Sequence, residues 1–399
     1  LWQWFVPSSS GFTKGILLKK KSQILVITNY RPDQQHSMLR FGDLLISKKN
    51  THSNLVVEAI FPSPVFTKIS PNIKLRKWAA YIDKYLIFPK RLKREMLNRK
   101  EQVKLIHIID HSNAIYLSKL SKITRAKKII TCHDLIAIRT AMGDFAQAPK
   151  TSKSGNRLQN WISDSLHHAD YYACDSGQTL KDLNRLIPLS KEKSSIIHLG
   201  TEPNSSSISE KKDLSKILPF DPLNTNFLLH VGSAAWYKNR KAVFRSFVHA
   251  LTCLPDQNLK LVLVGPEPQK EELDDQLKNW ITSNPSAIHS LQNLPENTLD
   301  TLYKYAKALV FPSFIEGFGW PPLEAAVRGC PVITTRTGAI ADLLSSYAKY
   351  VEAENQVSIN QGVEELLRSP AEKKASVNLP SHEDCRKQYF DLYEQVMAN

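Results

Sequence analysis

The sequence predicts an α/β protein built from two doubly wound, Rossmann-like domains that face a central cleft. Two patterns predict this fold class: short buried-strand runs alternate with helix-length stretches, and a polar segment divides the chain. The expected strands are residues 23–28, 55–60, 105–109, 128–131, 171–174 and 195–198 in the first half, and 227–231, 259–264, 308–311 and 332–335 in the second. Because alternating strands and helices favour parallel pairing, we expect one parallel sheet in each half.

The length of the chain also indicates two domains, since 399 residues exceed the size at which one hydrophobic core keeps growing. Residues 201–214 are rich in Ser, Glu, Lys and Asn and hold few apolar side chains, so we place the domain boundary there. We predict an irregular N-terminal extension over residues 1–22, a first domain over 23–213, a second over 214–380, and a C-terminal helix over 381–399 that packs back on the first domain.

The composition excludes several classes of protein. Hydrophobic residues make up 42% and charged residues 23%, as in soluble globular proteins, and no apolar run is long enough to span a membrane. The five cysteines are scattered without a C-x-x-C pair, which is typical of reduced cytosolic thiols and argues against zinc. The chain begins at Leu1 with an apolar stretch too short for a secretory signal, so we expect a fragment or a mis-set start.

A formal net charge of +15 indicates a negatively charged partner, which is nucleic acid, an anionic bilayer or a phosphorylated substrate. Residues 74–104 contain eleven Lys or Arg against three acidic residues, with Trp78, Tyr81 and Tyr85 among them. Such a stripe suits an anionic membrane surface. A solvated helix face is the alternative. Nucleic acid is not expected, because no helix-turn-helix, zinc-finger or RNA-recognition signature occurs.

A glycine-rich loop follows the expected strand 308–311 and precedes a helix that a Pro-Pro pair opens. In a parallel sheet this turn lies at the carboxyl ends of the strands, where open α/β proteins bind ligands. Gly317 and Gly319 let the backbone approach a ligand, and the free amides at the helix start favour a phosphate. Glu316 and Glu324 are suited to accept hydrogen bonds from sugar hydroxyls. Solvated carboxylates and glycines that merely turn the chain are the alternative.

The string EGFGWPPLEAAVRGCPV, residues 316–332, resembles the motif of retaining glycosyltransferase family 4, the "glycosyl transferases group 1" of GT-B fold. Every fixed position of the motif is matched. The resemblance implies that residues 214–380 bind a nucleotide-diphosphate sugar as donor and that residues 23–213 bind the acceptor. It also implies retention of the anomeric configuration, with no metal and no other cofactor.

The same resemblance implies roles for individual residues. Glu316 is expected to position the donor sugar and Glu324 to hold the ribose, while the intervening loop residues bind the donor. These loop residues are Gly317, Phe318 and Gly319.

A second family motif begins at Gly232, where Lys238 follows at the expected spacing. Lys238 is expected to stabilise the negative charge that the departing diphosphate acquires. Tyr237 stands where the family has an arginine, and Arg240 is the candidate for the missing cation. A solvated surface lysine is the alternative reading of Lys238.

His133 and Asp134 end the expected strand 128–131 and are similar to a His-Asp pair of the family, which implies that His133 touches the transferred sugar or the acceptor. A satisfied structural histidine followed by a capping aspartate is the alternative. The chain departs from the family pattern at residues 30–37, which lack the usual Gly-Gly pair, and at Asp342, where a glutamate is usual.

We therefore expect a hexosyltransferase, mannosyl or glucosyl, that acts on a saccharide or lipid-linked acceptor in cell-surface polysaccharide or glycolipid synthesis. Its expected location is the cytoplasm, with peripheral contact to the inner face of the plasma membrane. A sugar-nucleotide epimerase of the same architecture is one alternative, and a non-catalytic nucleotide-sugar or glycan-binding protein is another. Intact Glu316, Glu324, Lys238 and His133 argue against a decayed enzyme.

Overall fold

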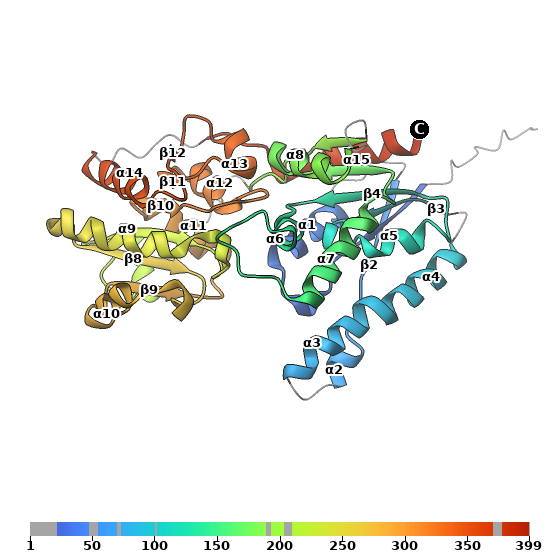
Figure 1. Cartoon of the computed structure of the whole chain (residues 1–399). Helices are drawn as coiled ribbons and strands as arrows, with labels where there is room; N and C mark the ends of the chain where they lie inside the picture. The colour runs from blue at the N-terminus through green and yellow to red at the C-terminus, as the bar shows by residue number, and fades with distance from the viewer. Residues whose placement is uncertain are drawn as a thin grey trace, which may run out of the picture.

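A computed structural model describes most of the chain as two α/β domains (Figure 1). The described residues are 22–47, 55–69, 73–99, 102–188, 193–202, 210–369 and 377–398. Residues 1–21 of the expected N-terminal extension and the middle of the expected linker lie outside them, while Ser22 is the first residue of β1. Within the described residues, no helix combines the length and the apolar character needed to cross a bilayer.

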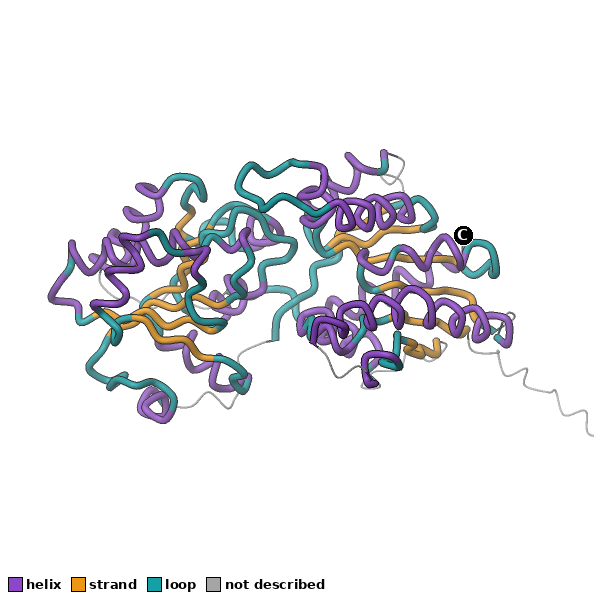
Figure 2. Tube along the Cα trace, turned by 60° about the horizontal axis from the view of Figure 1, so that its bottom comes forward, coloured by secondary structure: helices purple, strands orange, loops and turns teal. Residues whose placement is uncertain are grey.

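The first domain is a six-stranded parallel sheet in the order β2-β1-β3-β4-β5-β6. Its strands are Ser22–Ile27, Leu55–Ile60, Val103–Ile108, Lys127–Cys132, Tyr171–Cys174 and Ser194–Ile196, numbered β1 to β6. Its main helices are α1 (His36–Ile46), α5 (Ile115–Leu120), α6 (Ile136–Met142), α7 (Lys153–Leu166) and α8 (Gly177–Leu186). The inner strands are buried on both faces, as a sheet covered by helices on both sides requires (Figure 2).

The second domain repeats this architecture with the strand order β12-β11-β10-β7-β8-β9. Its strands, β7 to β12, are Asn226–Val231, Leu259–Val264, Ile288–Leu291, Ala308–Phe311, Val332–Thr334 and Lys349–Tyr350. Its helices are α9 (Arg240–Cys253), α10 (Asp275–Ser283), α11 (Glu296–Tyr305), α12 (Trp320–Val327), α13 (Gly338–Leu343) and α14 (Gln356–Arg368). Two parallel, doubly wound sheets confirm the predicted fold class.

The last helix, α15 (His382–Ala398), lies on the first domain although it follows the second in sequence (Figure 1). The hydroxyl of Tyr393 lies 2.7 Å from Nδ1 of His107 on β3, and the hydroxyl of Tyr389 lies 3.0 Å from that of Thr131 on β4. The chain therefore crosses between the domains twice. The two crossings lie side by side, because Thr201 forms a parallel bridge with Ser381.

A helical arm projects from the first domain between β2 and β3 (Figure 1). It consists of α2 (Phe66–Ile69), α3 (Ile73–Ile82), a π-helical segment (Asp83–Ile87) and α4 (Phe88–Asn98). Asp83 is fully buried at its base and accepts hydrogen bonds from the hydroxyls of Tyr30 and Thr67, at 2.9 and 2.8 Å. The same carboxylate accepts from the backbone N–H groups of Val65, Phe66 and Thr67. One buried carboxylate thus joins the arm to the domain.

Candidate active site

Residues 312–319 connect β10 to α12 and form the centre of the candidate site. β10 is fully buried and pairs in parallel with β11 and β7. The loop that follows β10 therefore lies at the carboxyl edge of the sheet. Gly319 has a φ of 81°, a left-handed conformation that glycine adopts without strain, and α12 starts directly after it. A Cβ on Gly317 would lie 1.8 Å from the carbonyl oxygen of His133. Glycine therefore allows the loop to contact the end of β4 in the other domain.

An ion pair between Glu316 and Lys238 lies at this loop. The Nζ atom of Lys238 is 2.8 Å from Oε1 and 3.0 Å from Oε2 of Glu316. Only 13% of the Lys238 side chain and 7% of the Glu316 side chain are exposed. The ammonium also lies 4.8 Å from the centroid of the Phe311 ring. Because so little water reaches the pair, a ligand that separates it must offer each charge a new partner.

Tyr237, which stands where an arginine was expected, lies beside this pair. Its ring centroid is 5.2 Å from Nζ of Lys238. Burial, together with the charges of Glu316 and Asp134, raises the pKa of its phenol. The phenol is therefore protonated at neutral pH and available as a hydrogen-bond donor.

Arg240, the candidate for the missing cation, does not join the pair. Its guanidinium is almost fully buried, with Nη2 donating to the carbonyl of Pro266 at 2.8 Å and Nε lying 3.3 Å from Glu272. Gly232 does lie beside the pair, since a Cβ on it would come within 3.7 Å of Cδ of Lys238. Lys238 is therefore the cation that the predicted motif contributes at Glu316.

His133 lies at the interface of the two domains, but its side chain is directed into the first domain and only 5% of the residue is exposed. Its Nε2 atom is 2.8 Å from the carbonyl oxygen of Ile109, and its Nδ1 atom is 3.3 Å from Asp175. Burial disfavours the charged ring, but the hydrogen bond and charge of Asp175, with the charge of Asp110, outweigh it and raise the pKa of His133. Both ring nitrogens thus have protein partners, as expected for the alternative interpretation of His133 as a satisfied structural histidine.

Glu324 contacts the first domain, where sequence reasoning missed its partner. Its Oε1 atom is 2.9 Å from Nη1 of Arg40 on α1, and its Oε2 atom accepts a hydrogen bond of 3.1 Å from the hydroxyl of Tyr303. The guanidinium of Arg40 also stacks over the ring of Trp320, 4.3 Å from its centroid. Because Arg40 lies 284 residues from Glu324 in sequence, no local pattern indicated this contact.

The loop between α6 and α7 carries a further contact between the domains. It extends toward the second domain (Figure 1), where the ring of Phe145 lies 5.2 Å from that of Trp236. At the start of α8, the backbone N–H of Gly177 donates a hydrogen bond of 2.8 Å to the carboxylate of Asp342. Asp342, which replaces the usual glutamate, thus contacts the start of α8.

The second domain matches a family model described as "Glycosyl transferases group 1" over residues 213–380. Residues 213–380 form a group 1 glycosyltransferase domain. This glycosyltransferase domain includes the loop of Glu316 and Gly319, the helix of Glu324, and Lys238. The expectation drawn from the motif is therefore confirmed at the level of the glycosyltransferase class.

Curated relatives of the chain include two bacterial mannosyltransferases. The chain is 26% identical over 227 residues to the O-antigen chain mannosyltransferase RfbU of Salmonella typhimurium, across 55% of this chain and 56% of that protein. It is 27% identical over 248 residues to the serotype-specific mannosyltransferase WbdA of Escherichia coli, across 59% of this chain and 29% of that protein. The chain thus spans about half or less of the length of these relatives.

Solved glycosyltransferase structures share the whole architecture. Sucrose-phosphate synthase from Thermosynechococcus elongatus has a TM-score of 0.70 at 16% identity, covering 95% of this chain and 100% of that chain. The catalytic domain of starch synthase IV from Arabidopsis thaliana, bound to ADP and acarbose, has a TM-score of 0.66 at 14% identity, covering 95% and 100%. At these identities the likeness shows the fold alone, which is the GT-B fold.

Proposed function

We propose that the protein is a retaining glycosyltransferase that transfers a hexosyl group from a nucleotide-diphosphate sugar to a saccharide or lipid-linked acceptor. The ion pair of Glu316 and Lys238 is the observation that carries this proposal. It places a carboxylate of the loop that opens α12 beside a cation of the loop between β7 and α9, at the carboxyl edge of a parallel sheet. A mannosyl group in the synthesis of a surface polysaccharide is our first choice, because two relatives are named as mannosyltransferases.

The pair suggests how donor binding prepares the reaction. A diphosphate that enters beside Lys238 offers the ammonium a stronger anionic partner, which frees the carboxylate of Glu316 to accept hydrogen bonds from the sugar hydroxyls. When the anomeric bond breaks, negative charge develops on the diphosphate, and Lys238 stabilises it. The protonated phenol of Tyr237 is placed to donate a hydrogen bond in the same region. The leaving oxygen takes the acceptor's proton on the face from which it departs.

A donor and acceptor assay tests this proposal. The full chain is incubated with GDP-mannose or with UDP-glucose, each with and without a mannosyl-terminated lipid-linked saccharide. We expect nucleoside diphosphate release only with acceptor, and an α-linkage by NMR, since retention preserves the donor's configuration. Isomerised nucleotide sugar in the absence of acceptor would instead support an epimerase. Binding without turnover would support a non-catalytic protein.

Glu324→Gln is expected to weaken nucleotide binding about tenfold while changing kcat little. On the proposed role, the carboxylate accepts hydrogen bonds from the ribose, and one charged hydrogen bond is worth about 1.5 kcal/mol. Arg40 and Tyr303 already hold the carboxylate at both oxygens, so the site is ordered before the ligand enters. Calorimetric titration with GDP or UDP measures the effect, and Glu271→Gln, in an exposed 3-10 helix, is the control. Unchanged affinity would remove Glu324 from the nucleotide site.

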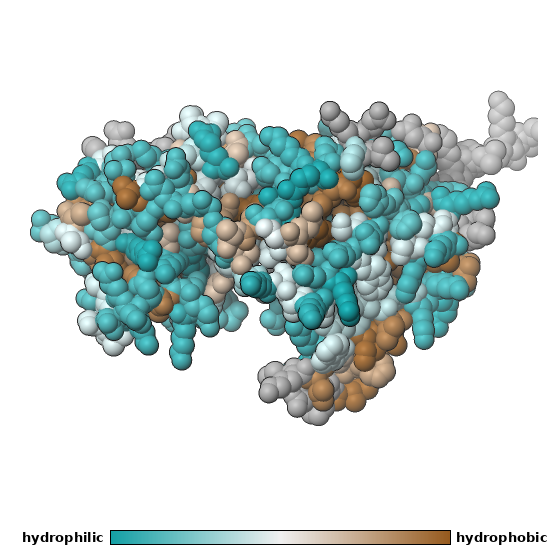
Figure 3. Space-filling model, viewed as in Figure 1, coloured by the Kyte–Doolittle hydropathy of each residue, from teal (hydrophilic) through white to brown (hydrophobic). Residues whose placement is uncertain are grey.

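We also infer that the helical arm contacts an anionic membrane, which on the expected location is the inner face of the plasma membrane. Of the twelve exposed large apolar side chains among the described residues, six lie between residues 65 and 86. They gather on the projecting arm (Figure 3) and are Val65, Phe66, Ile69, Leu75, Trp78 and Leu86. Exposed basic side chains accompany them at Lys68, Arg76, Lys77, Lys90, Arg91, Lys93 and Arg94. Apolar insertion and headgroup attraction therefore act together.

Replacing Ile69 and Trp78 by serine is expected to reduce vesicle binding at least tenfold, because each apolar side chain withheld from the bilayer costs about 1.5–3 kcal/mol. Co-sedimentation with vesicles containing phosphatidylglycerol measures the bound fraction. The control carries Leu223→Ser and Val357→Ser, which are 59% and 61% exposed outside the arm. The inference would be contradicted if the arm variant bound vesicles as well as the control variant did. It would also be contradicted if the wild type bound neutral vesicles as well as anionic ones.

A further inference from the structure

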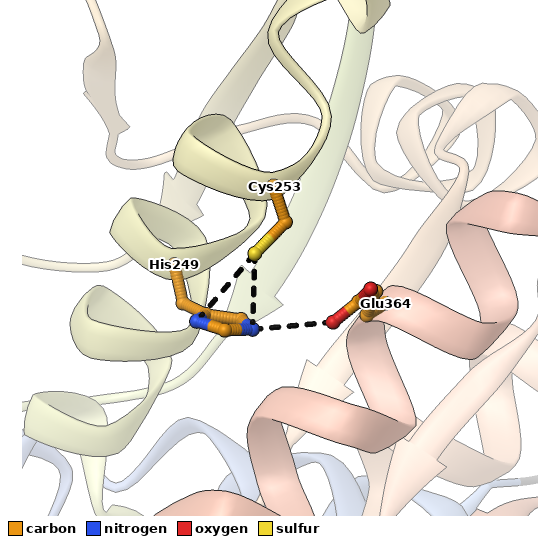
Figure 4. A group of neighbouring side chains, drawn as sticks. All are labelled: His249, Cys253 and Glu364. Carbon is orange, nitrogen blue, oxygen red and sulfur yellow. Dashed lines mark hydrogen bonds and ion pairs between the residues drawn. The ribbon is translucent and has the colours of Figure 1, made fainter.

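A group of potential metal ligands lies outside the donor site, between two helices of the second domain (Figure 4). His249 and Cys253 are one helical turn apart on α9, and Glu364 faces them from α14. Among the described residues, this is the group of three or more His, Cys, Asp or Glu side chains whose ligand atoms approach closely enough to share an ion. All its ligand atoms lie within 4.8 Å of one another.

The separations between the ligand atoms match those of a tetrahedral zinc site. Bonds of about 2.3 Å to sulfur, 2.0–2.1 Å to nitrogen and 2.0–2.2 Å to oxygen give tetrahedral edges of about 3.3–3.6 Å. Nε2 of His249 lies 3.5 Å from Sγ of Cys253 and 3.3 Å from Oε2 of Glu364. Sγ is also 3.9 Å from Nδ1 of His249, so it faces the ring, and coordination requires the partly exposed imidazole to turn.

A neighbouring arginine orients the carboxylate of this group. Nη2 of Arg368 lies 2.8 Å and Nε lies 2.9 Å from Oε1 of Glu364, while Oε2 faces His249. One oxygen is thus held by the protein and the other is directed at the candidate site, which is how outer partners fix metal-binding carboxylates. Thiolate, imidazole and carboxylate together suit Zn²⁺, whereas Mg²⁺ and Ca²⁺ prefer oxygen ligands alone.

We propose that His249, Cys253 and Glu364 bind one Zn²⁺ ion that joins α9 to α14. The ion has three protein ligands and completes its shell with water. At 1.5 Å per residue, the length of α9 places Cys253 about 20 Å from Arg240 at the other end of the helix, so the ion stabilises the domain and takes no part in transfer. The proposal departs from two expectations, that of no zinc, drawn from the scattered cysteines, and that of no metal, which the family resemblance implied.

Calorimetric titration of the reduced, tag-free full chain with zinc chloride tests the proposal. We expect one equivalent of zinc per chain, and at least tenfold weaker binding for Cys253→Ser and for Glu364→Gln, the loss typical of disrupted metal sites. Glu365→Gln is the matched control, because Glu365 is the next residue on α14 and pairs with Lys349 instead. Titration with Co²⁺ adds a signature, since direct thiolate ligation produces a sulfur-to-metal charge-transfer band that Cys253→Ser must lose.

The two variants come from different helices, so a folding defect in one does not decide the result. Sub-stoichiometric binding, or zinc affinity in Glu364→Gln and Cys253→Ser equal to that of Glu365→Gln, would overturn the proposal. A zinc-dependent rise in melting temperature for the wild type, absent in both variants, would support it.

Discussion

Glu316→Gln is expected to reduce kcat about 10²–10³-fold while changing nucleotide affinity no more than about twofold, because the contacts it removes are made in the transition state. The glutamine amide keeps the size of the side chain but loses the charge and one of the two acceptor oxygens. Lys238 then loses the partner that now lies 2.8 Å away. The ammonium is consequently at least as available to the diphosphate as before, so donor binding is retained.

Steady-state kinetics and nucleotide titration of the same preparations separate these two effects. Glu352→Gln is the control, because Glu352 is an exposed carboxylate of the same domain. Lys238→Met extends the test: if the pair acts as a unit, the double variant loses much less activity than the product of the two single losses. Wild-type turnover in Glu316→Gln would refute the proposed role of the loop. Weaker nucleotide affinity with an unchanged kcat would instead assign Glu316 to the nucleotide site.

Asp83→Ala is expected to lower the free energy of unfolding of the first domain by about 3 kcal/mol, since it removes the acceptor of several buried hydrogen bonds at once. The hydroxyls of Tyr30 and Thr67 and three backbone N–H groups lose their shared partner. For a domain of this size the melting temperature should fall by about 6–12 °C. Thermal unfolding measures the loss, and limited proteolysis shows whether the arm is cleaved first.

The charge of Asp83 also predicts a pH dependence. Burial opposes ionisation, but the hydrogen bonds from Phe66, Thr67 and Tyr30 outweigh it and lower the pKa below the usual 3.8. A lowered pKa means that this contribution to stability is present above the unfolded value and is lost as the pH falls through the folded value. Asp83→Asn should therefore flatten the loss of stability below about pH 4. An unchanged acid limb in this variant would contradict the assignment.

The positions of most strands along the chain were predictable because buried parallel strands are continuous apolar runs. β2, β5, β8 and β10 coincide with the predicted residues, and the other predicted strands differ from the structure by one or two residues at their ends. β9 (Ile288–Leu291) and β12 (Lys349–Tyr350) were missed. Both are short outer strands that no fully buried residue marks, so they lack the signal on which the prediction rests.

The candidate site was predictable only where a long motif fixed it. Two family motifs placed Glu316 and Lys238, which the structure brings together although they are 78 residues apart. These motifs gave no information on where side chains of the other domain approach. Packing between distant segments determines three features that the motifs did not predict: the contact of Arg40 with Glu324, the buried environment of Arg240 and the partners of His133. The zinc ligands were hidden for the same reason, since Glu364 comes from a different helix than Cys253.

The paired crossings at Thr201 and Ser381 have a mechanical consequence. A single strand between two domains permits rotation about many axes, whereas two strands bridged side by side behave as a hinge with one main axis. Gly200 tightens this hinge, because a Cβ there would lie 2.3 Å from the carbonyl oxygen of Ser381. Opening of the protein for substrate exchange is therefore expected to follow one arc, in which the loop of Gly317 swings away from His133 and returns to the same register.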